Sequence, residues 1–261
     1  MSLTPDQIRA ERTRTVEQIK RLFAVVMGLA VIRCISNIYS LIKPIITPPL
    51  VNPSASFQEH AQELVILFAQ GITFFSLISL FYLGWERSLE RRYLQPDSPV
   101  PRPERLLFDL FCLSWTALWF VILAESFPSA QDSASDRLRF LLNYQELFAK
   151  ILLIMYVIDT GLLLAHLGLL NWYRETPPAN FVKANWIWIT INVVTAAIIL
   201  AALDFNLQMR PLSWLFGINS LSVVLLTTHV IRFFVDFLST YQFYYPPENI
   251  PETPATSPTP V

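Results

Sequence analysis

Residues 186–203 read WIWITINVVTAAIILAAL, a continuous stretch without a single charged side chain. An α-helix needs about 20 predominantly apolar residues to cross a hydrocarbon core of about 30 Å. A helix on the surface of a soluble domain would instead alternate an apolar face with a charged one. This stretch therefore predicts a helix that spans a membrane.

Comparable apolar runs recur along the 261-residue chain, which is 53% hydrophobic and only 15% charged. An average soluble domain is about 25% charged, so lipid is the expected surrounding for most of this chain. The runs predict six spans, at residues 22–42, 61–83, 106–124, 147–170, 186–203 and 214–238. The expected fold is an all-α integral membrane protein, a six-helix transmembrane bundle.

The segments around the spans suggest three regions. Residues 1–21 form a charged, amphipathic N-terminal helix that leads into the first span, residues 22–245 form the six-span domain, and residues 246–261 form a disordered tail rich in Pro, Thr and Ser. Capping boxes at residues 4–7 (TPDQ) and 56–59 (SFQE) predict the starts of the first two helices. No proline falls inside a span, which favours continuous helices over the broken helices of many secondary transporters.

Basic residues predict the orientation, because the segments beside cytoplasmic helix ends carry an excess of Lys and Arg. With the N-terminus inside, the inner segments hold 12 basic residues and the outer segments hold 5. Both termini are therefore expected in the cytoplasm.

A charged residue in the middle of the first span points to an intramembrane site. An arginine at the centre of a span costs about 2.5–3.5 kcal/mol on insertion scales, so Arg33 should face the bundle interior together with Asn37. Its expected partner is Asp159 of the fourth span, which lies at a comparable depth. The pair is either a clamp that fixes helix packing or part of an anion site or conduction path.

The fourth span carries two distinctive faces. Asp159 and His166 share one face, and the small residues Gly161, Ala165 and Gly168 form a stripe on another, of the kind that permits close helix contact. Two such faces predict a central position for this helix in the bundle.

The sixth span ends with His229, Arg232 and Asp236 on one face. The fourth and sixth spans run in the same direction, so His166 and His229 are expected at like depth near the cytoplasmic side. Two such histidines raise the alternative of a haem held between them. The simpler interpretation is two hydrogen-bonded histidines, and no cofactor is otherwise predicted.

Further polar residues extend these faces into a candidate path through the bundle, since rows of intramembrane polar groups serve proton relays and ion pathways. The same residues would serve equally well as interhelical hydrogen bonds. The candidate path consists of Arg33, Asn37, Glu63, Gln70, Asp159, His166, Asn192, His229, Arg232 and Asp236.

The motifs of common enzyme classes are absent from the sequence. It contains no His-Glu-x-x-His, Gly-x-Ser-x-Gly, Cys-x-x-Cys or phosphate-binding loop, and no catalytic residue or metal ligand is predicted. Cys34 and Cys112 lie within apolar runs and are expected to be small apolar fillers, and no basic tract suggests nucleic acid. Lipid is the expected partner, with a homo-oligomer or a membrane complex as further alternatives.

Three functions remain open on these grounds. The first is a small ion or proton channel or carrier that uses the polar path. The second is a non-catalytic membrane subunit or assembly factor of a larger complex, and the third is a bis-histidine haem or quinone electron carrier.

Overall fold

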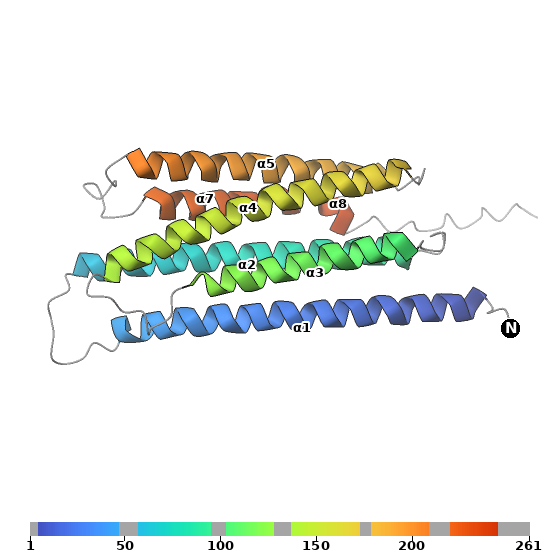
Figure 1. Ribbon diagram of the computed structural model, residues 1–261, viewed down its shortest axis with the longest axis horizontal. Coiled ribbons are helices and arrows are strands. Elements are labelled where there is room, and N and C mark those ends of the chain that lie inside the picture. Colours follow the sequence, from blue (N-terminus) through green and yellow to red (C-terminus); the bar gives the residue numbers. More distant parts are fainter. Residues whose placement is uncertain are drawn as a thin grey trace, which may run out of the picture.

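The protein is a bundle of six long α-helices, all roughly parallel to one axis (Figure 1). The computed structural model describes residues 5–46, 57–94, 103–127, 137–172, 179–208 and 220–244. The helices are α1 (Pro5–Ile46), α2 (Phe57–Tyr93), α3 (Pro103–Glu125), α4 (Arg137–Trp172), α5 (Ala179–Gln208) and α7 (Ser220–Ser239), followed by the short α8 (Tyr241–Tyr244). Six of them are long and apolar enough to span a membrane, as the sequence predicts.

The charged N-terminal segment and the first span form one continuous helix. At a rise of 1.5 Å per residue, the 42 residues of α1 extend about 63 Å, about twice the thickness of a hydrocarbon core. Its first turns project beyond the other helices at the end where α1 begins, which is called the near end below, in contrast to the opposite far end (Figure 1). The capping residues Thr4 and Ser56, residues 214–219 of the sixth predicted span, and the tail at 246–261 lie outside the described residues.

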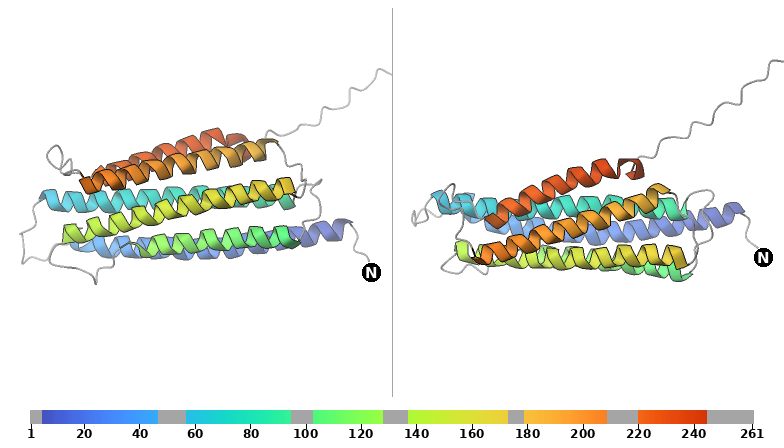
Figure 2. Two further views of the ribbon diagram at one scale, coloured as in Figure 1. Left: turned by 45° about the horizontal axis from the view of Figure 1, so that its top comes forward. Right: turned by 90° about the horizontal axis from the view of Figure 1, so that it is seen from above.

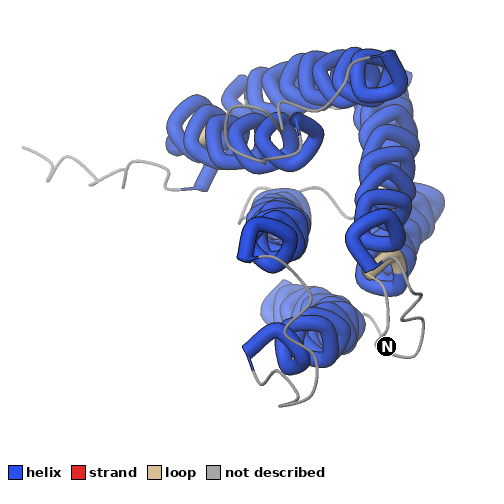
Figure 3. The backbone as a smooth tube through the Cα atoms, turned by 90° about the vertical axis from the view of Figure 1, so that its left-hand side faces the viewer, coloured by secondary structure: helices blue, strands red, loops and turns tan. Residues whose placement is uncertain are grey.

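The helices pack in two groups joined through α2. One group is α1 with α2 and α3, and the other is α5 with α4 and α7, while α2 contacts both α7 and α4. Figure 1 and the left view of Figure 2 show α1 and α5 on opposite sides of the bundle, and Figure 3 shows the bundle from one end. Among the described residues, no Cα atom of α1 lies within 8 Å of a Cα atom of α4, α5 or α7.

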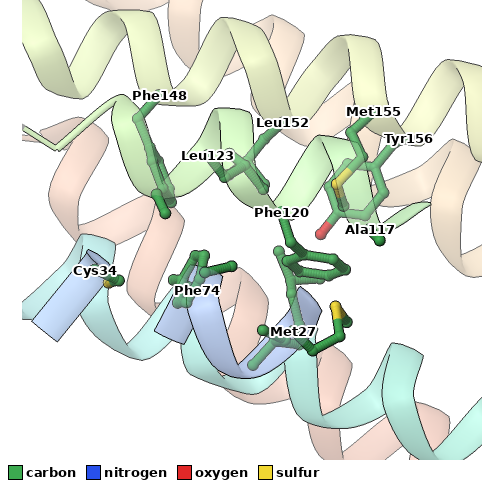
Figure 4. Packing of buried hydrophobic residues seen from close by; sticks show 14 of the residues in the cluster. Met27, Cys34, Phe74, Ala117, Phe120, Leu123, Phe148, Leu152, Met155 and Tyr156 are labelled. Carbon is green, nitrogen blue, oxygen red and sulfur yellow. The ribbon is translucent and has the colours of Figure 1, made fainter. Parts of the chain in front are cut away.

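Aromatic side chains fill the core between these groups. Phe74 of α2 meets Phe120 and Phe127 edge to face, with ring centroids 6.1 Å apart in both pairs, and Phe127 meets Phe148 of α4 at 5.5 Å (Figure 4). Such edge-to-face pairs add about 0.5–1.5 kcal/mol each to the burial of their apolar area. Cys34 lies in the same core (Figure 4), and both it and Cys112 are buried and free, as expected of fillers.

Large apolar side chains also cover the outside of the bundle. Leu22, Leu29 and Ile32 of α1 and Phe234 and Leu238 of α7 are more than half exposed. In water such a surface would drive aggregation, whereas in a bilayer it faces lipid. The chain is an integral, multi-pass membrane protein.

The small-residue stripe of α4 is not where the sequence predicts it. A Cβ atom built on Gly161 or Gly168 meets no other atom within 4 Å, and Ala165 is exposed. The stripe faces away from the bundle, so the prediction that it marks α4 as the central helix is wrong. The share of buried residues is highest in the span of α2.

Candidate functional site

A buried polar cluster lies where α4, α5 and α7 meet. The central polar cluster consists of Tyr156, Asp159, Trp188, Asn192, His229, Arg232 and Asp236. On α7, the buried stripe repeats at positions 222, 225, 229, 232 and 236, spacings of three and four that put one side of a helix against its neighbours. Five members of the predicted path meet here, namely Asp159, Asn192, His229, Arg232 and Asp236.

Asn192 joins the charged groups of α4 and α7. Its Oδ1 accepts a hydrogen bond of 2.7 Å from Nη2 of Arg232, and its Nδ2 donates one of 2.5 Å to Oδ2 of Asp159. The carboxylate of Asp236 accepts from Trp188 Nε1 at 2.8 Å. The two acids are thus held mainly by neutral donors.

His229 is fixed in one tautomer by its two neighbours. Its Nδ1 lies 2.7 Å from the carbonyl oxygen of Leu225, which can only accept, so Nδ1 carries the proton. Its Nε2, 2.8 Å from the hydroxyl of Tyr156, then accepts from that hydroxyl. The ring is neutral in this arrangement.

A second cluster lies at the near end, on α2, α3 and α4. Asp109 forms an ion pair with Arg92 and accepts a 2.5 Å hydrogen bond from the hydroxyl of Tyr93. Arg105 Nη2 lies 2.8 Å from His166 Nε2 and donates to it. Of this near-end cluster, the predicted path included only His166.

A cavity connects the two clusters. Its volume is about 80 Å³, and because one water needs about 10–15 Å³ on this measure, it has room for several. Arg92 and His166 line it toward the near end, and the central polar cluster contributes Asp159, Asn192, Trp188, Arg232 and Asp236. Between these groups its walls are mainly apolar and aromatic, with Leu80, Phe81, Trp85, Leu162 and Leu163.

Buried polar groups continue from the central polar cluster toward the far end. Gln145 of α4 donates a 2.7 Å hydrogen bond to Ser222 of α7. Gln70 and Thr73 of α2 are fully buried, and neither the amide of Gln70 nor the hydroxyl of Thr73 has a hydrogen-bond partner. Glu63, also buried, lies two turns before Gln70 on α2 and therefore closer to the far end.

The alignment of α2 beside α7 shows at which depth of the bundle Gln70 and Thr73 lie. Gly71 and Leu226 line the same apolar groove, and Arg91 donates a 2.6 Å hydrogen bond to the carbonyl of Phe243. The two helices therefore run in the same direction. Gln70 and Thr73 fall at the depth between Ser222 and His229, so polar groups succeed one another from the far end to the near end.

The predicted pair of Arg33 and Asp159 is wrong. Nε and Nη2 of Arg33 bind the two carboxylate oxygens of Glu125 at 2.8 and 3.0 Å. These two side chains are 51% and 53% exposed, on the α1–α3 side of the bundle. The position of Arg33 in the sequence indicates its depth and not the direction in which it points, and the backbones of α1 and α4 do not approach within 8 Å.

Asn37 also has a structural partner instead of a place in the path. Its Nδ2 donates to the carbonyl oxygens of Ala124 at 3.1 Å and Phe127 at 3.4 Å, where α3 ends. Carbonyls at a helix end have no partner within the helix, so Asn37 caps α3. Arg33 and Asn37 both lie outside the central polar cluster.

The expected common depth of the two histidines is also wrong. His229 bonds to Tyr156, which precedes His166 by ten residues on α4, or about 15 Å along the helix axis. The imidazoles cannot take opposite sides of one haem iron at that separation, and each already has a hydrogen-bond partner. Across the described residues, no group of three or more His, Cys, Asp and Glu side chains is arranged to hold a metal ion.

Several residues of the site carry no signal in the sequence. Tyr156, Trp188 and Gln145 look like ordinary members of apolar or amphipathic helices. Arg92 and Arg105 stand out only as positive charges near span ends, which served to predict orientation. Comparison of the chain with protein-family models, curated proteins and solved structures finds no match.

Proposed function

We propose that the protein moves protons across the membrane along the buried polar groups of α2, α4, α5 and α7. The observation that carries this proposal is the length of the polar line. From Gln145 to His166, α4 advances about 31 Å, the thickness of a hydrocarbon core. Over this length, neighbouring helices contribute polar groups at each depth.

Asp159 and Asp236 are the proton-binding groups in this proposal. Both line the cavity, which has room for water between them and the near end. Chains of acids, histidines and water are the usual carriers of protons through membrane proteins. Toward the far end, Gln70 and Thr73 add two buried polar side chains without a hydrogen-bond partner at the depth between Ser222 and His229, which shortens the apolar interval in the line.

The basic residues give this path a direction relative to the cell. With 12 basic residues in the inner segments against 5 in the outer ones, we assign the near end, with its cavity, to the cytoplasm. The cavity then takes up protons from the cytoplasmic side, and the narrower polar line leads outward.

The test is proton flux through the purified protein in liposomes. A potassium gradient with valinomycin sets the membrane potential, and an enclosed pH-sensitive dye reports proton entry. Wild type should acidify the vesicles, and Asp159→Asn or Asp236→Asn should slow this by at least about tenfold, because a proton-binding site is lost. Glu125→Gln is the matched control, since that acid lies outside the path. Equal rates in all variants and in empty liposomes would reject the proposal.

A second candidate function, a subunit of a membrane complex, has one observation in its favour. The exposed stripe of Gly161, Ala165 and Gly168 would allow close approach of another transmembrane helix. Cysteine cross-linking from Ala165→Cys in native membranes tests this role, with Leu164→Cys as the control on the same helix. Equal cross-linking from both positions would count against an interface at the stripe.

A further inference from the structure

The guanidinium group of Arg232 is held in place by its neighbours, but only some of its hydrogen-bond donors have a partner. Its residue is 6% exposed, its Nη2 donates to Asn192, and its Cζ lies 4.3 Å from the centre of the Tyr156 ring. Nε and Nη1 have no hydrogen-bond partner in the structure. A buried charge is normally paired, because desolvating it is costly. Arg232 therefore keeps two unused donors in its buried guanidinium group, beside a cavity that the residue lines.

The acids nearest to Arg232 do not use these donors. Asp159 is bound to Asn192, and Asp236 to Trp188 and to the hydroxyl of Thr240. Within the part of the chain that the structure describes, no carboxylate forms an ion pair with Arg232 inside the 4.0 Å limit. Arg232 has acids nearby, yet it interacts with the side chains of Asn192 and Tyr156, which leaves donors for an oxygen ligand that the chain itself does not supply.

The cavity beside Arg232 suits a small molecule with one charged end. Its charged groups are Arg92 on one side and Asp159, Arg232 and Asp236 on the other, and Phe81, Trp85, Leu162 and Leu163 provide much of its apolar wall. A guanidinium is planar and can form two parallel hydrogen bonds with a carboxylate, which makes a carboxylate a better ligand for it than a neutral group. The volume of about 80 Å³ limits the ligand to a few heavy atoms.

We propose that the cavity binds a small monovalent carboxylate on Arg232, and that protons on Asp159 and Asp236 accompany it. This inference rests on the proposed proton movement and adds its co-substrate. While both acids are ionised they outnumber Arg232 and repel an anion, and once they are protonated the positive charge of Arg232 prevails. The anion therefore enters together with protons.

The titratable and charged groups that surround Arg232 come from four helices. They are Arg92 on α2, Cys112 on α3, Tyr156, Asp159 and His166 on α4, and His229 and Asp236 on α7. The fifth helix of the site, α5, adds the neutral Asn185, Trp188 and Asn192.

The test is equilibrium binding of radiolabelled acetate to the full-length protein in detergent, measured by scintillation proximity at pH 7.5. Asp159→Asn should bind acetate about tenfold more tightly than wild type, because one like charge beside the anion is removed. The asparagine still offers an oxygen to Asn192. A gain in affinity cannot result from misfolding, so this variant keeps the test decisive.

Loss of the guanidinium gives the opposite result. Arg232→Gln should abolish acetate binding in the Asp159→Asn background, whereas Arg33→Gln, which changes an arginine outside the cavity, should leave it unchanged. Excess acetamide should not displace acetate. If Asp159→Asn weakens binding, or if trimethylammonium competes for the site, the cavity selects cations and the inference fails.

The two proposals fail separately. Proton flux in liposomes, measured with and without acetate and compared with empty liposomes, tests the path, and acetate binding in detergent tests the cavity. Flux without acetate binding would leave the proton path and overturn the carboxylate site. Acetate binding without proton flux in either condition would leave the site and overturn the proposed transport.

Discussion

Replacing Asn192 by leucine removes the group that connects Arg232 to Asp159. Leucine has the same number and branching of side-chain heavy atoms, so the change deletes two hydrogen bonds without opening a cavity. Hydrogen bonds to charged groups contribute about 1.5–3 kcal/mol each in water-soluble proteins, while interhelical hydrogen bonds in membranes average about 0.6 and reach about 1.7 kcal/mol. Two bonds to charged groups at the upper membrane value give a loss of about 3 kcal/mol in the free energy of unfolding.

The chain contains a matched control for this substitution. Asn185 lies two turns before Asn192 on α5 and is equally buried, but its Nδ2 donates only to the carbonyl of Phe181 within its own helix. Asn185→Leu should therefore cost less than about 1 kcal/mol. Reversible unfolding in mixed micelles of increasing SDS fraction measures both values. If Asn192→Leu costs no more than Asn185→Leu, the hydrogen bonds that link α4, α5 and α7 through Asn192 do not stabilise the bundle.

Three further outcomes are expected. Ser129→Cys should react with an impermeant maleimide on intact cells and Ser98→Cys only after permeabilisation, and the reverse pattern would invert the orientation. The exposed pair of Arg33 and Glu125 should show a coupling energy below about 1 kcal/mol in a double-mutant cycle of alanine variants, and a larger value would mean that lipid strengthens the pair. Tyr156→Phe deletes the hydroxyl that donates to His229 and should cost about 1 kcal/mol in mixed-micelle unfolding, so an unchanged stability would contradict that hydrogen bond.

The helices of this protein can be predicted from the sequence because the length of an apolar run has a direct physical meaning. A run such as residues 186–203 must span a membrane wherever its neighbours lie, and the structure places it within α5. The same reasoning finds α7 despite its charges, since its remaining side chains are strongly apolar. Burial of the polar face of α7 also follows, because such a face is costly in lipid.

The partners of the polar residues could not be predicted in the same way. Position in a run gives depth along a helix, and this suggested that Arg33 would pair with Asp159. Pairing also requires that two helices touch and that both side chains point into the contact, which depends on the packing of all six helices. The depth of His229 was misjudged: α7 begins opposite the first part of α4, where Gln145 meets Ser222, so His229 lies beside Tyr156 and not beside His166.

The free energy of inserting α7 into a membrane helps to explain the central polar cluster. On insertion scales, an arginine or an aspartate at the centre of a span is unfavourable by about 2.5–3.5 kcal/mol, while each Leu, Ile, Phe or Val is favourable by about 0.3–0.6 kcal/mol. Of the six spans, α7 has the lowest mean hydropathy, 1.8, so its insertion is close to balanced and depends on α2 and α5 to cover Arg232 and Asp236. Apolar residues at both positions would remove this cost, and replacing buried ionic groups by apolar ones is often neutral or stabilising. A purely structural role gives no reason to maintain Arg232 with two unpartnered donors beside a cavity, whereas binding of a carboxylate and protons requires such a group.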